Sequence, residues 1–232
     1  IHTVATAPVL LVAHDWGATH AWNFTLRHPE AVSRLTVMSV PLRAHTNIPP
    51  TEAYKKRFGD QFFYQLYFQR PTLPEQEFDA DPRAIISRLL CSPDTPRKKR
   101  TVSNSRHEPG GWTDRLGEPL ELPSWLTSTE LDYYANVYAK HGFAGGIHYY
   151  RNIDKNWELM APYSSKRIEC PVLFIAGTED ISLMGADKQQ LETLMHPRIH
   201  NLTMRLFPGK GHWIQQEAEE EVNAELISFL KQ

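Results

Sequence analysis

The hydrophobic pattern of the first 43 residues predicts a strand, a helix and a second strand. Residues 9–13 form a short continuous apolar run, which is typical of a parallel strand covered on both faces. Residues 18–28 read as a helix that Pro29 ends, and residues 35–40 form a second strand-like stretch that halts at Pro41. Two parallel strands joined through a helix form a right-handed crossover unit.

From about residue 43 to residue 163 the pattern changes to aromatic, proline-punctuated helical pieces without a convincing strand. Thr127 and Glu130 fit a capping box, so we expect a helix that runs from there to about Lys140. Residues 93–121 are rich in Pro, Gly, Arg and Ser, and we expect a long surface excursion there. The whole stretch reads as a helical cap inserted into another domain.

After Pro171 the parallel pattern resumes. We expect a strand at residues 172–176, a helix at 186–195, a strand near 203–207 and a terminal helix from about Glu217. The carboxylates Glu217, Glu219 and Glu220 fall in the first turn of that last helix, where the helix dipole favours negative charge. The chain is therefore predicted to be an α/β protein, with a core made of residues 1–43 and 164–232 and a cap made of residues 44–163.

Composition narrows the function classes. The 232 residues carry a net charge of −2, and the one concentrated basic run, at residues 97–100, is short, so neither nucleic acid nor a membrane is expected as a partner. Apolar runs fall well short of the ~20 residues that span a bilayer. Cys91 and Cys170 lie far apart without metal-like spacing, which favours free thiols and a cytoplasmic location. Oligomeric state is left open.

The turn after the first strand carries a candidate nucleophile. Ala13-His-Asp15-Trp-Gly17 has small residues two positions either side of its centre, the form of a nucleophile elbow between a strand and a helix. The central side chain is a carboxylate, which suits attack on an sp3 carbon and formation of an alkyl ester. Taken alone, Asp15 could equally be a helix N-cap.

Two later turns supply an acid and a histidine. Glu179 and Asp180 follow the strand at 172–176, and His212 follows the next strand, so all lie at carboxyl ends of parallel strands, where catalytic groups gather. Nucleophile, acid and then histidine is the chain order of α/β-hydrolases. The spacing leaves Glu179 and Asp180 open as the acid, and His212 alone would more often be structural.

These residue types define a two-step reaction. Asp15 attacks carbon, and His212, held in one tautomer by the acid, takes a proton from the water that then attacks the ester carbonyl. The backbone N–H of Trp16 should donate to the oxyanion of this second step, with another donor from a loop after an earlier strand.

Several separated motifs resemble those of the epoxide hydrolases with an α/β-hydrolase fold. They are His14-Asp-Trp-Gly17, Tyr64-Gln-Leu-Tyr-Phe-Gln69, Gly142-Phe-Ala-Gly-Gly-Ile-His-Tyr-Tyr-Arg-Asn152 and Gly211-His-Trp-Ile-Gln-Gln-Glu217. The resemblance covers nearly the whole chain and implies the C-terminal part of that mostly parallel sheet with an inserted cap. It favours Asp180 over Glu179 as the acid, and it implies that Tyr64 and Tyr150 protonate the epoxide oxygen on ring opening.

The resemblance implies hydrolysis of an apolar epoxide by water to a vicinal diol, with no metal or organic cofactor. Trp16, Trp213, Tyr67 and Phe68 are candidate pocket residues, although Tyr67 and Phe68 also fit a packed helical face. A haloalkane dehalogenase shares the Asp nucleophile and the His base but needs halide-binding donors in place of paired tyrosines. A non-catalytic homologue or an inactive fragment is the other alternative.

The start of the chain departs from the family pattern. The family has strands before the elbow and a His-Gly-any-Pro loop that gives the second oxyanion donor, whereas this sequence opens at Ile1 shortly before the elbow strand. The strand at 9–13 would then expose an apolar edge. We therefore expect this length of chain alone to be weakly stable and a poor catalyst.

Overall fold

The computed structural model describes residues 7–100 and 102–231, and the chain divides into two units. The sheet unit comprises residues 1–45 and 160–232, and the helical unit comprises residues 46–159. The corresponding boundaries predicted from the sequence lie after residues 43 and 163. Residues 1–6 of the first predicted core segment lie outside the described residues.

Four strands form one parallel sheet within the described part of the sheet unit. Their order is β1-β2-β3-β4, with β1 at Val9–His14, β2 at Val32–Met38, β3 at Val172–Gly177 and β4 at Leu202–Phe207. Every residue of β3 is buried, as its continuous apolar run predicts, whereas Leu10 and Val12 on β1 are about half exposed. The predicted parallel sheet is confirmed.

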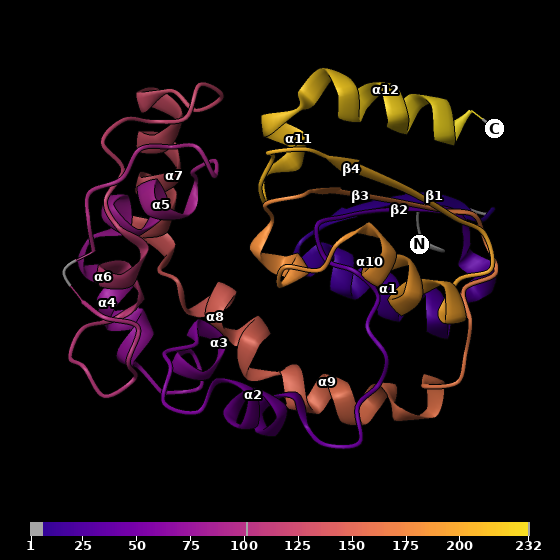
Figure 1. Cartoon of the computed structure of the whole chain (residues 1–232), viewed down its shortest axis with the longest axis horizontal. Helices are drawn as coiled ribbons and strands as arrows, with labels where there is room; N and C mark the ends of the chain where they lie inside the picture. The colour runs from indigo at the N-terminus through magenta and orange to yellow at the C-terminus, as the bar shows by residue number, and fades with distance from the viewer. Residues whose placement is uncertain (1–6, 101, 232) are drawn as a thin grey trace. The chain divides into compact units, whose positions relative to one another are not determined.

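Helices cover both faces of this sheet. Figure 1 shows α1 (Trp16–Arg27) and α10 (Lys188–Met195) on one face and α12 (Glu219–Leu230) on the other. Alternate strand residues point to opposite faces, so Phe174 packs with α1 and α10 while Leu173 and Ile175 pack with Val222 and Phe229 of α12. Both faces of β3 are thereby buried, which explains its lack of polar alternation.

Several predicted boundaries are wrong by a few residues. β2 ends at Met38 and not at residue 40, because Ser39 adopts a left-handed backbone with φ 71°. α1 begins directly after Asp15, and α10 begins only after Asp187, whose side chain caps it. The single predicted terminal helix is two, α11 (Ile214–Glu217) and α12, so Glu217 ends the first helix while the acidic first turn belongs to the second.

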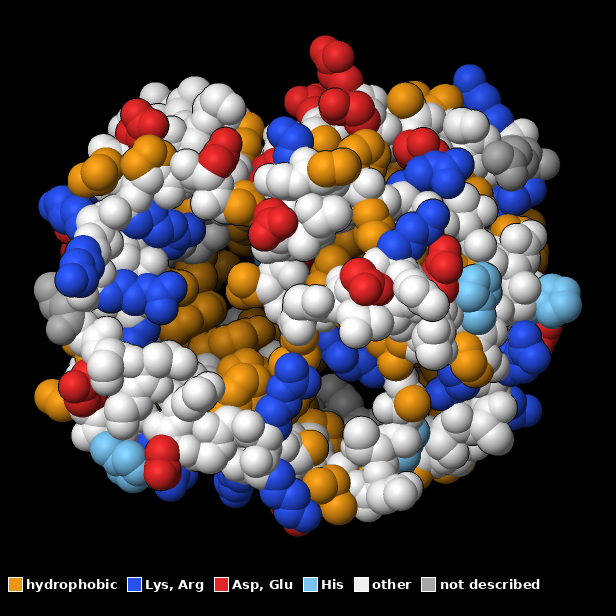
Figure 2. All heavy atoms as spheres, in the orientation of Figure 1, with side chains coloured by type: hydrophobic (Ala, Val, Ile, Leu, Met, Phe, Trp, Pro, Cys, Tyr) orange, Lys and Arg blue, Asp and Glu red, His pale blue; other side chains and the backbone are white. Residues whose placement is uncertain are grey.

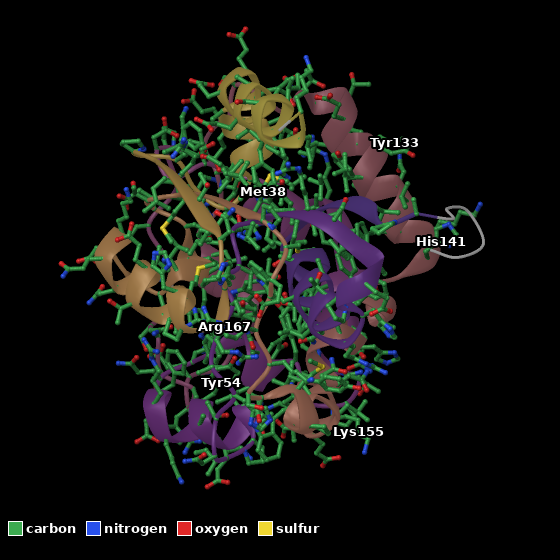
Figure 3. All side chains as sticks on the ribbon, turned by 90° about the vertical axis from the view of Figure 1, so that its right-hand side faces the viewer. Met38, Tyr54, Tyr133, His141, Lys155 and Arg167 are labelled. Atoms are coloured by element: carbon green, nitrogen blue, oxygen red, sulfur yellow. The ribbon has the colours of Figure 1, made fainter. Side chains whose placement is uncertain are left out.

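The helical unit contains the predicted cap helix with its capping box. α7 (Ser128–His141) is preceded by Thr127, whose hydroxyl accepts from the Glu130 N–H while the Glu130 carboxylate accepts from the Thr127 N–H. Figure 3 labels Tyr133 and His141 on this helix. The other helices are α2 (Pro50–Phe58), α3 (Tyr64–Tyr67), α4 (Leu73–Ala80), α5 (Pro82–Leu89), α6 (Trp112–Leu116), α8 (Ala144–Arg151) and α9 (Ile153–Met160).

The predicted surface excursion at residues 93–121 is wrong in part. It contains α6, and Arg115 on that helix is only 4% exposed. The Arg115 guanidinium donates to the carbonyls of Ser105, Glu108, Gly110 and Gly111, and it lies over the Phe62 ring. A buried arginine thus organises a segment whose composition suggests only a loop.

The surface agrees with the near-neutral charge of the chain. Side chains of both signs are spread over the face drawn in Figure 2. Among the helices of the described residues, none combines the length and the apolar character needed to cross a membrane.

Candidate active site

Asp15 stands at the turn between β1 and α1. Its backbone has φ 53° and ψ −121°, a conformation that a non-glycine residue rarely adopts and that functional turns often hold. Asp15 occupies the N-cap position of α1, yet within the described residues its side chain makes no capping hydrogen bond to that helix. A Cβ on Gly17 would meet the Ala13 Cβ at 3.8 Å, an ordinary contact, so this approach does not by itself require glycine.

Asp180 stands after β3 and is 3% exposed, whereas its neighbour Glu179 is exposed. The Oδ1 atom of Asp180 accepts a hydrogen bond from the Ser182 N–H at 2.8 Å. This contact opens a short 3-10 turn at Ile181–Leu183 and fixes the carboxylate. Of the two acids that the spacing leaves open, Asp180 is the one that faces His212.

His212 lies between the two aspartates, in the loop after β4. Its Nδ1 atom is 3.1 Å from Oδ1 of Asp180, and its Nε2 atom is 3.5 Å from Oδ1 of Asp15. The hydroxyl of Ser182 is also 3.2 Å from Nδ1. The sheet thus brings together three residues that lie far apart in the sequence, with the imidazole bridging the carboxylates.

The carboxylates of Asp15 and Asp180 determine the protonation state of His212. Burial alone would lower the pKa of His212, but hydrogen bonds and charge interactions with Asp15 and Asp180 outweigh it and raise the pKa to about 9. Burial alone would raise the pKa values of both aspartates, and the contacts with His212 more than reverse this. The backbone N–H of Trp16 also hydrogen-bonds the Asp15 carboxylate and lowers its pKa.

Two residues outside the predicted set of site residues, His14 and Ser39, bond to the main chain of His212. Nε2–H of His14 and the hydroxyl of Ser39 both donate to the His212 carbonyl, at 2.8 and 2.9 Å. Burial, followed by the charge of His212, lowers the pKa of His14, which favours a neutral ring. Ser39 carried no sequence signal, because its left-handed backbone is visible only in the structure.

Tyr64 and Tyr150 come together within the helical unit. Their ring centroids are 5.6 Å apart at an interplanar angle of 78°. Nε2–H of Gln65 donates to the Tyr64 hydroxyl at 3.0 Å. The Trp112 ring stacks on Tyr64 at 4.7 Å and 9°, a partner that lies in the supposed surface excursion.

Comparisons with known proteins identify the family. The alpha/beta hydrolase fold family matches residues 6–219. The chain is 39% identical to epoxide hydrolase A of Mycobacterium tuberculosis, covering 94% of this chain and 67% of that protein, and 33% identical to epoxide hydrolase 1 of Siraitia grosvenorii, covering 94% and 68%. The crystal structure of epoxide hydrolase A from Mycobacterium thermoresistibile matches with a TM-score of 0.87 at 37% identity, covering 97% of this chain and 69% of that one.

The chain belongs to the epoxide hydrolase family. The predicted family and α/β-hydrolase fold are confirmed. The Asp15, Asp180 and His212 cluster is the candidate catalytic centre of this hydrolase, and Tyr64 and Tyr150 remain its predicted proton donors.

The candidate pocket residues of this epoxide hydrolase have different surroundings. Tyr67 is 8% exposed and Phe68 is 2% exposed, and both pack in the apolar core of the helical unit. The Tyr67 hydroxyl donates to Glu77, and the Phe68 ring contacts both Tyr64 and Tyr150 edge-on. In the sheet unit, Trp213 packs against His212 with ring centroids 5.2 Å apart. The ring centroids of Trp16 and His20, both on α1, are 6.1 Å apart.

Among residues 7–100 and 102–231, no group of three or more His, Cys, Asp or Glu side chains is arranged to hold a metal ion. The imidazole of His212 lies between two carboxylates, an arrangement that suits proton transfer.

Proposed function

We propose that this epoxide hydrolase converts an epoxide into a vicinal diol through an alkyl ester formed on Asp15. The observation that carries the proposal is the position of His212, with one ring nitrogen facing Asp180 and the other facing Asp15. The Asp180 side chain is fully buried, while Asp15 is 39% exposed and can meet a substrate. The buried carboxylate of Asp180 therefore suits orientation of His212, and the partly exposed carboxylate of Asp15 suits attack on the substrate.

In the first step, a carboxylate oxygen of Asp15 attacks an epoxide carbon. The new C–O bond forms as the ring C–O bond breaks, and the ring oxygen takes a proton from Tyr64 or Tyr150. Such a donor is needed because an alkoxide is a poor leaving group. The lowered pKa of Asp15 keeps the nucleophile ionised at neutral pH.

In the second step, Nε2 of His212 takes a proton from water, and the resulting hydroxide attacks the carbonyl carbon of the Asp15 ester. The Trp16 N–H donates to the oxyanion. As the oxyanion collapses, the ester C–O bond breaks, and the proton of the new carboxyl group passes to the departing alkoxide, which gives the diol and the Asp15 carboxylate. The proton held by His212 then returns through solvent to the tyrosinate left by the first step. Asp180 holds the Nδ1–H tautomer and stabilises the imidazolium. Ester formation removes the negative charge of Asp15, so the pKa of His212 should fall from about 9 and favour the neutral base.

The substrate that we propose is an apolar epoxide, with water as the second reactant. The proposal rests on the aromatic surroundings of the two tyrosines, which include Phe68, Trp112 and Phe63. A cytoplasmic location is proposed from the free thiols of Cys91 and Cys170.

A single turnover in oxygen-18 water tests the reaction. Excess enzyme is mixed with styrene oxide, and the diol and the Asp15 peptide are analysed by mass spectrometry. We expect unlabelled diol from the first turnover, because its new oxygen comes from Asp15, and label in the Asp15 carboxylate. Asp15→Ala should form no diol. Label appearing directly in the first diol would overturn the ester mechanism, and turnover of a haloalkane but not of the epoxide would favour a dehalogenase.

A further inference from the structure

Glu217 holds the backbone on both sides of His212. Its Oε2 atom accepts a hydrogen bond from the Gly211 N–H at 2.8 Å, and its Oε1 atom accepts one from the Trp213 N–H at 3.1 Å. Glu217 is the last residue of α11, so its side chain folds back from that helix to the loop. One carboxylate thus connects the residue before His212 to the residue after it.

Other backbone atoms of the loop that carries His212 accept hydrogen bonds from residues on, or shortly after, the strands. The Lys210 carbonyl accepts from the Glu179 N–H at 2.9 Å, and the His212 carbonyl accepts from His14 and Ser39. These contacts fix carbonyl groups only. The amides of Gly211 and Trp213 point to Glu217, so removing this carboxylate would take away the acceptor that both amides share.

We infer that Glu217 is a positioning residue that keeps the imidazole of His212 aligned between Asp15 and Asp180, an inference that rests on the proposed function. A carboxylate suits the task because both of its oxygens only accept, and here each meets a backbone donor. A glutamine offers one accepting oxygen and a donating NH₂ group. Glu217→Gln therefore leaves one N–H facing another donor while the side chain keeps its size.

The two chemical steps depend on this alignment differently. Ester formation uses Asp15 and a proton donor, whereas ester hydrolysis needs Nε2 of His212 at the attacking water. Misplacement of a catalytic group by about 1 Å can cost roughly 100-fold in rate. Loss of the Glu217 contacts should therefore slow hydrolysis more than ester formation. If the Glu217 carboxylate only capped α11, its loss would change stability and leave the ratio of the rates of ester formation and ester hydrolysis unaltered.

Rapid-quench kinetics distinguishes positioning of His212 by Glu217 from mere capping of α11. Wild type, Glu217→Gln and the control Glu220→Gln are mixed with styrene oxide, and the Asp15 ester is followed by mass spectrometry of quenched protein. Glu220 is an exposed residue in the first turn of α12, so its change removes the same charge. We expect Glu217→Gln to hydrolyse the ester about tenfold more slowly and to accumulate it. Glu220→Gln should match wild type. An unchanged ratio of the two steps in Glu217→Gln would overturn the inference.

A titration of His212 by NMR gives a readout that does not need turnover. The His212 resonance is assigned by its absence in His212→Asn. In wild type the pKa is about 9, and in Glu217→Gln it should fall towards 6.5 as the carboxylate contacts loosen. An equal titration in both proteins would refute the positioning role. If wild type forms no ester while its titration differs from that of Glu217→Gln, the proposed function fails and the alignment by Glu217 stands.

Discussion

Nδ1 of His212 lies 3.1 Å from Oδ1 of Asp180, whose side chain has no exposed surface. The buried charge fixes the tautomer that leaves Nε2 free to take a proton. Asp180→Asn keeps the shape but removes the charge, so we expect ester hydrolysis to slow on the order of 10²- to 10⁴-fold. Ester formation should change far less, and the Asp15 ester should accumulate in single-turnover mass spectrometry.

The matched control for this change is Asp132→Asn, which alters an exposed carboxylate on α7 that pairs with Arg83. It should leave both steps unaltered, because exposed ion pairs contribute little. Equal slowing of ester formation and hydrolysis in Asp180→Asn would point to a general loss of folded enzyme and contradict the assigned role.

The raised pKa of His212 predicts how stability depends on pH. The pKa is about 9 in the folded chain against an ordinary 6.5, so the folded state binds this proton more tightly than the unfolded state does. That stabilisation is complete below about pH 6.5 and is lost as pH rises through about 9. We expect this group's contribution to the free energy of unfolding, measured by urea denaturation at a series of pH values, to fall across that interval.

His212→Asn isolates this group. The variant lacks the titrating ring, so its free energy of unfolding should change less steeply between about pH 6.5 and about pH 9 than that of wild type. Parallel curves for the two proteins over this interval would show that the carboxylates do not raise the pKa of His212.

If Tyr64 and Tyr150 are the proton donors, loss of their hydroxyls should slow ester formation and not ester hydrolysis. Tyr64→Phe combined with Tyr150→Phe keeps both rings, whose centroids are 5.6 Å apart, but removes both hydroxyls. General acid catalysis typically contributes about 10²- to 10⁴-fold, so ester formation should slow by that order. Rapid-quench measurement of ester formation with excess enzyme gives this rate directly.

Tyr133→Phe is the control for this double change, since Tyr133 is 67% exposed on α7. It should retain the wild-type rate. A double variant that forms the ester as fast as wild type would remove the acid assignment from Tyr64 and Tyr150.

Local sequence patterns predicted much of the fold and of the central cluster. The apolar runs at 9–13 and 172–176 lie in β1 and β3, and the pairing of Thr127 with Glu130 marks the start of α7. These features depend on residues a few positions apart, which periodicity and capping chemistry read well. Asp15 and His212 could be predicted as candidate site residues because each follows a recognisable strand.

The missed features depend on contacts between distant segments. His14 and Ser39 reach the carbonyl of His212 across 198 and 173 positions, and such bonds to the main chain leave no residue-type signature on the accepting side. Trp112 meets Tyr64 because Arg115 and Glu77 organise a segment whose composition resembles a loop. Only the packed structure determines which side chains these segments meet.

Gly177, the last residue of β3, lies against the loop that carries His212. A Cβ at this position would lie 2.1 Å from the carbonyl oxygen of Lys210, 2.3 Å from its carbon and 2.7 Å from the carbonyl oxygen of Gly211. All three are backbone atoms, so no side-chain rotation relieves the overlap. Gly177→Ala must therefore displace either the end of β3, which leads to Asp180, or the loop before His212.

We expect Gly177→Ala to lose about 1–3 kcal/mol in free energy of unfolding, measured by urea denaturation, because the added methyl overpacks a closed site. Ester hydrolysis should slow by about tenfold or more, since His212 and Asp180 move apart. Gly146→Ala is the matched control: the site lies on α8, a Cβ there meets nothing within 4 Å, and alanine favours the helix. Gly177→Ala could instead match Gly146→Ala in free energy of unfolding and in rate of ester hydrolysis. The loop would then adapt without moving the imidazole, and close packing against β3 would not hold His212 in place.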